Sequence, residues 1–389
     1  MPQPLMIESR PIGAGHPALI VAELSANHGG SLDRALELVR LAHDAGADAI
    51  KLQTYRPDTM TIDCTAPWFR VQGGLWHGRT LWDLYTEAHT PWEWHEPLFA
   101  EARRCGLLAF STPFDATSVD FLERFNLPCY KIASFEVGDL PLLERVAETK
   151  RPVIVSTGMA SLDEIEQAVA TLRNGGCPNV ILLSCVSAYP AEPRDFKLRN
   201  LPMLADRFDV HAGLSDHSSG SLVAVTATAL GARVIEKHFC RRRSDGGPDA
   251  AFSAEPEEFA DLVRAVRNTE SMLQPSRLGP SLAEEGSLVF RRSLFAVRDI
   301  APGELFTSEN VRVIRPGFGL PPGDLPRVLG RTAATALQRG TPLAWEHVSG
   351  RDRRDDAHGV VAGTTNAASA SAGTSGDLAI NSRGWSSRR

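Results

Sequence analysis

Residues 18–28 read ALIVAELSANH, and this stretch decides the fold. An unbroken apolar run over residues 18–22 is followed by the polar residues Glu23, Asn27 and His28. A near-continuous apolar run is typical of a strand that is buried on both faces of a parallel sheet. The pattern therefore predicts a parallel strand whose carboxyl end delivers polar side chains to one edge of the sheet.

The same pattern recurs along the chain, with amphipathic segments between the apolar runs. Helical spacing of apolar residues predicts helices over 31–45, 162–172, 221–230 and 257–273, and Ser31 is a candidate N-cap. Eight strand–helix units over roughly 250 residues favour a (β/α)8 TIM barrel over the alternative, a doubly wound sheet. The predicted strands cover residues 18–24, 49–52, 108–110, 129–132, 153–155, 180–183, 210–214 and 234–235.

Changes in composition along the chain predict its domain organisation. Residues 1–275 carry the strand–helix pattern, whereas residues 288–349 are β-branched and punctuated by Gly and Pro, which predicts a small β-rich domain. Residues 276–287 are the expected linker. Residues 350–389 are rich in Ala, Ser, Gly and Thr with little to bury, so we expect a disordered tail. The long connection 55–90 is expected to be a lid or substrate wall, because such loops in compact domains are usually functional.

Charge and composition restrict the class of protein. The 41 basic and 47 acidic residues give a net charge of −6, which argues against a general nucleic-acid or membrane-surface binder. No apolar stretch approaches the ~20 residues that a membrane span needs, and residues 1–17 do not resemble a secretory signal. The six cysteines form no CxxC pair, so we expect a reduced, cytoplasmic setting.

Lysines and hydroxyl groups follow the predicted strands, at the end of a barrel where active sites lie. Lys51 and Lys131 supply positive charge, and the hydroxyls supply directed hydrogen bonds, which suits a phosphate group. The alternative for each hydroxyl is that it caps the helix that follows. Taken with two lysines, the set favours a phosphate site. The hydroxyls concerned are those of Thr112, Ser134, Ser156 and Ser215.

Histidines and carboxylates complete the predicted site. His217 and His238 follow neighbouring strands, and they either share a divalent metal ion or form hydrogen bonds at the barrel mouth, two interpretations with equal weight. Glu23 and Glu136 are the expected acids or bases, because they end strands one and four and are expected to face the pocket. Strand alternation places Glu236 either partly outward or in the lower layer of the barrel.

Four further features carry weaker signals. Asp216 and Asp249 are additional candidate acids or bases. Cys185 ends the sixth strand, but the sequence indicates neither a nearby base nor an exposed position, so we interpret it as a packing residue. The aromatic group at residues 92–95 either walls a sugar or holds a helix against the barrel, and we favour the structural role.

Seven motifs, each weak alone, together resemble those of a known family. The chain resembles the sialic acid synthase family, whose members condense phosphoenolpyruvate with an amino sugar to make nonulosonic acids, and is most similar to its pseudaminic acid branch. The resemblance covers residues 17–348 and implies a TIM barrel followed by an SAF, or antifreeze-like, domain. The motifs are AELSANH (22–28), KLQTYRPDTMT (51–61), TPWEWH (90–95), YKIASFE (130–136), GLSDH (213–217), EKHF (236–239) and GPDAAFS (247–253).

The resemblance implies a role for each candidate residue. His217 and His238 match metal ligands, with manganese expected and magnesium or cobalt as alternatives, and Glu23 matches the acid–base residue. Glu136 matches a residue on the sugar side. The residues that match phosphoenolpyruvate contacts are Lys51, Thr112, Lys131, Ser134, Ser156, Ser187 and Ser215. Those that match further sugar contacts are Gln53, Tyr189, Asp249 and Arg315.

The resemblance also implies a partner and two departures from the family pattern. Two chains are expected to form a domain-swapped homodimer, in which Arg315 of the C-terminal domain contacts the sugar held by the partner's barrel. Ser187 stands where sialic acid synthases have Asn, which puts that phosphate contact in doubt. Gly29 stands where Asn is commoner. Neither departure removes a lysine or a metal ligand.

The implied activity joins phosphoenolpyruvate, water and 2,4-diacetamido-2,4,6-trideoxy-altrose to give pseudaminic acid and phosphate, for a surface or flagellar glycan. A synthase for N-acetylneuraminate or legionaminate is the alternative within the family. A non-catalytic sugar- or ice-binding protein and a metal-dependent aldolase are alternatives outside it. The two lysines, the two histidines and Glu23 argue against the binding protein, which has no need of them.

Overall fold

The computed structural model describes residues 2–273 and 278–350. The chain divides near residue 276 into two compact units, each with its own hydrophobic core. Within the predicted linker, residues 276 and 277 lie outside the described residues, and so does the predicted tail from residue 351 onward. The two units are described separately below.

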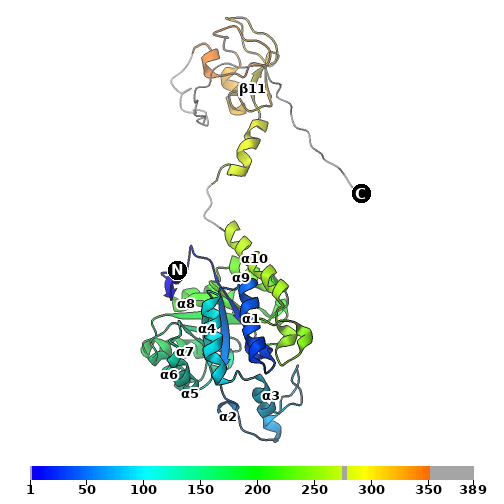
Figure 1. Cartoon of the computed structure of the whole chain (residues 1–389). Helices are drawn as coiled ribbons and strands as arrows, with labels where there is room; N and C mark the ends of the chain where they lie inside the picture. The colour runs from blue at the N-terminus through cyan, green and yellow to red at the C-terminus, as the bar shows by residue number, and fades with distance from the viewer. Residues whose placement is uncertain (1, 274–277, 351–389) are drawn as a thin grey trace. The chain divides into compact units, whose positions relative to one another are not determined.

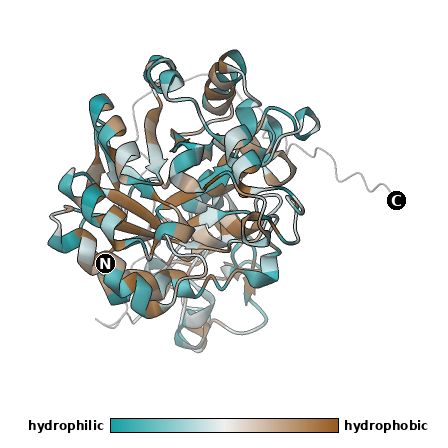
Figure 2. Ribbon diagram, turned by 90° about the horizontal axis from the view of Figure 1, so that it is seen from below, coloured by the Kyte–Doolittle hydropathy of each residue, from teal (hydrophilic) through white to brown (hydrophobic). Residues whose placement is uncertain are grey.

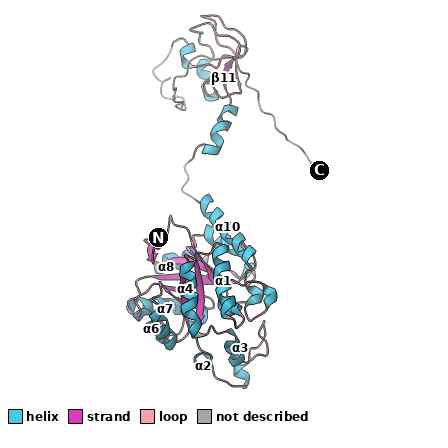
Figure 3. Ribbon diagram, in the orientation of Figure 1, coloured by secondary structure: helices cyan, strands magenta, loops and turns pink. Residues whose placement is uncertain are grey.

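The first unit is a closed barrel of eight parallel strands surrounded by helices (Figures 1 and 3). Its first strand pairs with both the second and the last, so the sheet has no edge, and the doubly wound alternative is wrong. Most strands continue past their predicted ends, because the polar residues that follow each apolar run still form hydrogen bonds to the neighbouring strands. The strands are β3 (Leu19–Glu23), β4 (Ala49–Thr54), β5 (Leu108–Pro113), β6 (Tyr130–Ile132), β7 (Val153–Ser156), β8 (Val180–Cys185), β9 (His211–Asp216) and β10 (Val234–His238).

The helices bury their apolar stripes against the outside of the barrel, where brown strands lie inside an outer ring of largely teal helices (Figure 2). Ser31 caps the first helix by accepting a hydrogen bond from the Arg34 amide, as predicted. The four predicted helices are confirmed. The helices around the barrel are α1 (Leu32–Asp44), α4 (His95–Arg104), α5 (Ala116–Leu122), α6 (Leu140–Glu148), α7 (Leu162–Asn174), α8 (Asn200–Phe208), α9 (Leu222–Ala229) and α10 (Pro256–Met272).

The long connection after β4 has secondary structure of its own. It contains α2 (Pro57–Met60) and α3 (Leu81–Ala88), which lie at the end of the barrel opposite the N-terminus (Figure 1). The aromatic group that follows is structural: Trp92 stacks on Phe121, with ring centroids 4.3 Å apart, and packs against the barrel core. This contact confirms the favoured interpretation of residues 92–95.

A short hairpin seals the amino end of the barrel, and the sequence did not predict it. The strands β1 (Leu5–Ile7) and β2 (Arg10–Ile12) pair with each other in antiparallel fashion. Ile7 and Ile12 are fully buried and belong to the same apolar cluster as the inward-facing residues of the barrel strands, such as Phe110. The hairpin therefore closes the amino end of the barrel with apolar side chains.

This packing predicts that Ile7→Ala lowers the free energy of unfolding by about 2–5 kcal/mol, because it leaves a cavity among buried side chains. The matched control is Met6→Ala in the same strand, since Met6 is 51% exposed; its effect should stay within about 0.5 kcal/mol. Urea titration followed by tryptophan fluorescence measures both. Equal effects of the two substitutions would contradict the sealing role of the hairpin.

The second unit is small and rich in β-structure, as predicted. The strands β11 (Ser293–Ala296) and β12 (Val311–Ile314) pair antiparallel, and α11 (Leu325–Val328) packs on the same core. A 3-10 helix over Leu282–Phe290 begins inside the predicted linker. Arg315 directly follows β12 and is exposed on this unit.

Candidate functional site

A cavity of about 450 Å³ opens at the carboxyl ends of the barrel strands. Parallel strands of a closed barrel end on the same side, so residues that are far apart in sequence meet there. The wall on the side of the long connection is apolar, whereas the floor is charged. The predicted site residues that line this cavity are Lys51, Gln53, Lys131, Ser134, Glu136, Ser156, Tyr189, Ser215, His217, His238 and Asp249.

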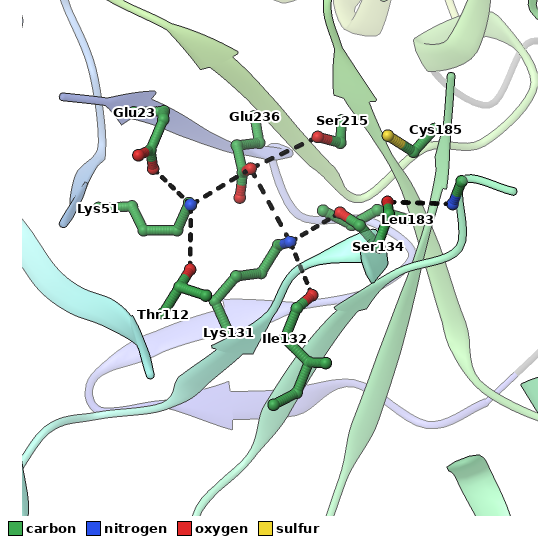
Figure 4. A network of polar contacts seen from close by, with 12 residues as sticks. Glu23, Lys51, Thr112, Lys131, Ile132, Ser134, Leu183, Cys185, Ser215 and Glu236 are labelled. Atoms are coloured by element: carbon green, nitrogen blue, oxygen red, sulfur yellow. Dashed lines mark hydrogen bonds and ion pairs between the residues drawn. The ribbon is translucent and has the colours of Figure 1, made fainter. Parts of the chain in front are cut away.

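Glu236 lies between the two lysines of the cavity floor (Figure 4). Its Oε1 atom lies 3.6 Å from Lys51 Nζ and 3.9 Å from Lys131 Nζ. Lys51 Nζ also lies 2.5 Å from a second carboxylate oxygen, Glu23 Oε2. Of the two alternatives left open by the sequence, Glu236 therefore occupies the lower layer of the barrel. Its position between the lysines is a feature that the sequence reasoning missed.

The four charged groups shift one another's pKa values. Burial raises the pKa of Glu236, but the two lysines outweigh burial and lower it. Burial also dominates at Glu23, where the lysines compensate only in part, and the pKa rises to about 7. Burial lowers the pKa of Lys131, whereas at Lys51 the attraction to the two carboxylates overcomes burial and raises the pKa. With Glu23 largely protonated below pH 7, the floor carries excess positive charge, which favours an anionic ligand.

Two of the four hydroxyl groups hold the lysines, and none of the four is the N-cap of the helix that follows. Thr112 accepts a hydrogen bond from Lys51 Nζ at 3.1 Å, and Ser156 accepts one from Lys131 Nζ at 2.7 Å. Ser215 donates to Glu236 at 3.4 Å. The helices that follow β5, β6, β7 and β9 have other N-cap residues, so the capping interpretation is wrong for all four hydroxyls. Those N-cap residues are Asp115, Asp139, Ser161 and Ser221.

Gly158 lets three polar side chains crowd against one loop. A Cβ atom at this position would lie 2.5 Å from Ser187 Oγ, 2.9 Å from Ser134 Oγ and 3.3 Å from Cys185 Sγ. Ser134 accepts a hydrogen bond from the Gly158 amide at 3.1 Å, whereas Ser187 Oγ is buried without a hydrogen-bond partner among the described residues. Ser187 does not line the cavity. Its hydroxyl faces the same glycine, Gly158, as the hydroxyl of Ser134, which does line the cavity.

His217 and His238 lie side by side, with ring centroids 5.4 Å apart. The Nδ1 atom of His217 lies 2.7 Å from the Val186 carbonyl oxygen, so it is the donor and leaves Nε2 free to bind a ligand. Burial keeps the pKa of His238 well below its usual value, which leaves a neutral imidazole. Burial lowers the pKa of His217, but interactions with Cys185 and the Val186 carbonyl outweigh burial and raise it. Two adjacent imidazoles, one of them oriented by a carbonyl, suit a divalent metal ion. Among the described residues no cluster of three or more such ligands occurs, so this pair would hold an ion with open positions.

Polar groups around Asp249 form another part of the cavity wall. Ser25 donates a hydrogen bond to Asp249, and Gln53 Nε2 donates to Ser25 Oγ at 3.1 Å. Burial raises the pKa of Asp249. Tyr189 packs on His217 with ring centroids 4.4 Å apart. Ser25 escaped the sequence analysis, although it lies in the same motif as Glu23.

Two carboxylates do not lie where the sequence suggested. Glu23 is fully buried beneath Lys51 and is not among the residues that line the cavity, because β3 ends in the layer below the mouth. Asp216 faces outward, where Lys237 Nζ lies 2.8 Å from its Oδ2 atom and both side chains are buried. Thr112 likewise acts behind the wall, through Lys51.

Cys185 lies beside a histidine, a proximity that the sequence did not indicate. Its Sγ atom lies 3.9 Å from His217 Nδ1, and the thiol lines the cavity. Burial opposes the thiolate, but His217 outweighs burial and lowers the pKa of Cys185. A residue interpreted as packing therefore borders the site.

The outward pair predicts a structural effect. Lys237→Met should lower the free energy of unfolding by about 3–5 kcal/mol, because it leaves the Asp216 carboxylate buried without its cation. Adding Asp216→Asn should recover much of this loss, since the remaining group is then neutral. A double-mutant cycle from urea titrations measures the coupling. Additive effects of the two substitutions would show that the pair does not interact.

Comparisons with known proteins agree with this geometry. Fold and site together define a TIM-barrel protein with a cationic cavity and an appended β-rich domain. The NeuB family model matches residues 38–277, and the SAF domain model matches residues 291–349. The chain therefore belongs to the NeuB family, and the resemblance to sialic acid synthases and the SAF domain are confirmed.

Individual relatives extend over most of the chain. Pseudaminic acid synthase of Campylobacter jejuni subsp. jejuni serotype O:23/36 is 45% identical over 83% of this chain and 94% of its own length. Pseudaminic acid synthase of Helicobacter pylori is 42% identical over 85% and 98%. The crystal structure of N-acetylneuraminic acid synthetase from Leptospira borgpetersenii serovar Hardjo-bovis, in complex with citrate, is 33% identical with a TM-score of 0.66, covering 74% of this chain and 96% of that one.

Proposed function

We propose that this chain is a pseudaminic acid synthase, a transferase that condenses phosphoenolpyruvate with 2,4-diacetamido-2,4,6-trideoxy-altrose and water, and releases phosphate. The observation that carries the proposal is the buried pair of lysines around Glu236, in one cavity with His217, His238 and Glu136. The 45% identity to a pseudaminic acid synthase supports the choice of sugar.

Phosphoenolpyruvate binds at the cavity floor in this proposal. Lys51 and Lys131 neutralise its phosphate and carboxylate, and they stabilise the phosphate as it leaves. Thr112 fixes Lys51, while Glu23 shares a proton with Lys51 from below; its predicted acid–base role stays a prediction. The hydroxyls that complete the phosphate site are those of Ser134, Ser156, Ser187 and Ser215.

A divalent metal ion binds to His217 and His238 in this proposal, with manganese preferred and magnesium or cobalt as alternatives. When bound, such an ion supplies Lewis-acid polarisation of the sugar aldehyde. The chain's own contribution is to present two adjacent imidazoles, one of them oriented by the Val186 carbonyl. The remaining ligand positions fall to water and substrate.

The reaction forms one C–C bond and breaks one C–O bond. Carbon 3 of phosphoenolpyruvate attacks the aldehyde carbon of the open-chain sugar, and Glu136 protonates the alkoxide that results. Water adds to carbon 2, and the proton that it loses restores the acid group. The tetrahedral intermediate then expels phosphate toward Lys51 and Lys131, while its hydroxyl becomes the carbonyl of the product and the hydroxyl proton leaves on phosphate. Burial raises the pKa of Glu136 to about 7, so this group is half protonated at pH 7 and mostly protonated below it.

Sugar recognition completes the proposal. Gln53, Tyr189 and Asp249 contact the sugar, and Arg315 from the second unit of a partner chain contacts its acetamido group in a domain-swapped homodimer. Among the described residues no helix is long and apolar enough to cross a membrane. We propose a cytoplasmic enzyme whose product enters surface or flagellar glycans.

N-acetylneuraminate or legionaminate synthesis is the alternative function. The sialic acid synthetase of Leptospira is 33% identical, compared with 45% for the pseudaminic acid synthase of Campylobacter. A sugar-binding protein would release no phosphate, and a metal-dependent aldolase would handle pyruvate without releasing any. Phosphate release therefore separates a synthase from both of these classes.

The central prediction is that the chain releases phosphate from phosphoenolpyruvate only when manganese and the diacetamido sugar are both present. His217→Ala should lower kcat/KM by at least 100-fold, because it removes half of the metal site. His43→Ala is the control, since His43 is an exposed histidine on α1. Absence of phosphate release with any diacetamido hexose or with N-acetylmannosamine would overturn the proposed function, and full activity of His217→Ala would overturn the metal role.

The raised pKa of Glu136 predicts a pH dependence. An acid with a pKa of about 7 loses its proton as the pH rises through 7, so the rate should fall on that side. Glu136→Gln should lower kcat by about 100-fold to 10,000-fold and abolish this alkaline limb. Glu144→Gln, an exposed carboxyl on α6, is the control. If Glu136→Gln keeps the fall in rate above pH 7 unchanged, another group is the proton donor.

A further inference from the structure

Helix α3 turns an apolar stripe toward the cavity. Its residues Leu81, Leu84, Tyr85 and Ala88 line the cavity at the i, i+3, i+4, i+7 spacing of one helix face. In an ordinary surface helix such a stripe covers the protein core. Here it forms the wall of a ligand site.

Within the described part of the chain, the buried residues of the α3 stripe do not belong to an apolar core cluster. Leu84 and Ala88 are 8% and 9% exposed, and the neighbouring Tyr55 is 2% exposed. None of the three belongs to an apolar core cluster of the described residues, whereas the buried stripes of α1 and α6 do. Met60 and Phe114 complete the same wall. These side chains therefore surround space that a ligand's apolar group can fill.

Polar groups occupy the opposite part of the cavity. The reacting end of the sugar is fixed near the lysines and Glu136, and carbon 6 is the carbon farthest from the aldehyde carbon. The phenols of Tyr55 and Tyr85 are within electrostatic reach of Asp249 and Glu136, which places them at the border of the polar side. Leu81, Leu84 and Ala88 offer no hydrogen-bonding group.

We propose that this face of α3 receives the C6 methyl group and makes the enzyme select 6-deoxy hexoses; this inference rests on the proposed function. A methyl group needs no partner, whereas a C6 hydroxyl would be buried against Leu81, Leu84 and Ala88, which cannot pair with it. An apolar pocket rejects an added hydroxyl by about 100-fold in kcat/KM. The preference of the unmodified enzyme for the deoxy sugar should have that size.

The test compares two sugars that differ only at carbon 6. These are 2,4-diacetamido-2,4,6-trideoxy-altrose and its 6-hydroxy counterpart, assayed by phosphate release with the full chain, manganese and phosphoenolpyruvate. Leu84→Asn removes apolar contact and supplies a partner for the hydroxyl, so the deoxy/hydroxy ratio of kcat/KM should fall at least tenfold. The KM for phosphoenolpyruvate should stay within twofold, because the floor is untouched.

Two further variants keep the test decisive. Leu84→Met conserves volume and should keep the preference. Thr86→Asn lies on the other face of α3, which lines a separate surface groove, and should change nothing. If the thermal midpoint indicates that Leu84→Asn is unfolded, Leu81→Asn replaces it with the same expectation.

The outcomes separate the two proposals. Equal use of both sugars by the unmodified enzyme, or an unchanged ratio in a folded Leu84→Asn or Leu81→Asn variant, overturns the role of α3 while leaving the synthase activity in place. No phosphate release with either sugar overturns the proposed function itself. A tenfold or larger fall in the ratio, with Leu84→Met and Thr86→Asn unchanged, supports the inference.

Discussion

The site depends on two ammonium groups, those of Lys51 and Lys131, that are held out of water around Glu236 inside a closed barrel. Buried charges are tolerated only when they are paired and hydrogen-bonded. Lys51, Lys131 and Glu236 come from β4, β6 and β10, so the pairing exists only when the barrel closes in the correct register. The charges at the cavity floor are therefore balanced only in a barrel that has closed correctly.

The two ends of the barrel divide the tasks of stability and chemistry. At the amino end, the hairpin of residues 5–12 and the inward apolar residues exclude water. At the carboxyl end, the same strands present lysines, hydroxyls and imidazoles to a cavity. The apolar layer beneath the floor supplies the low dielectric that strengthens each polar contact above it.

Much of the architecture could be predicted from the sequence, because strand periodicity and strand-end chemistry are local signals. The hairpin could not be predicted, because its two strands have three residues each and one of them contains Pro11. Its apolar side chains find a partner only at the open end of the folded barrel. The partners of Glu236 depend on register between strands that are distant in sequence. Alternation did hold the missing information: Glu236 shares a face with His238, and Asp216 lies opposite Ser215 and His217.

The histidine pair has a thermodynamic consequence. A divalent ion held by His217 and His238, as proposed, would take its remaining bonds from water or substrate oxygens where no third side chain of the described residues is in reach. Its affinity and that of the sugar are then linked, and each must raise the other by the same factor. Metal retained by the resting protein therefore understates the affinity that holds during turnover.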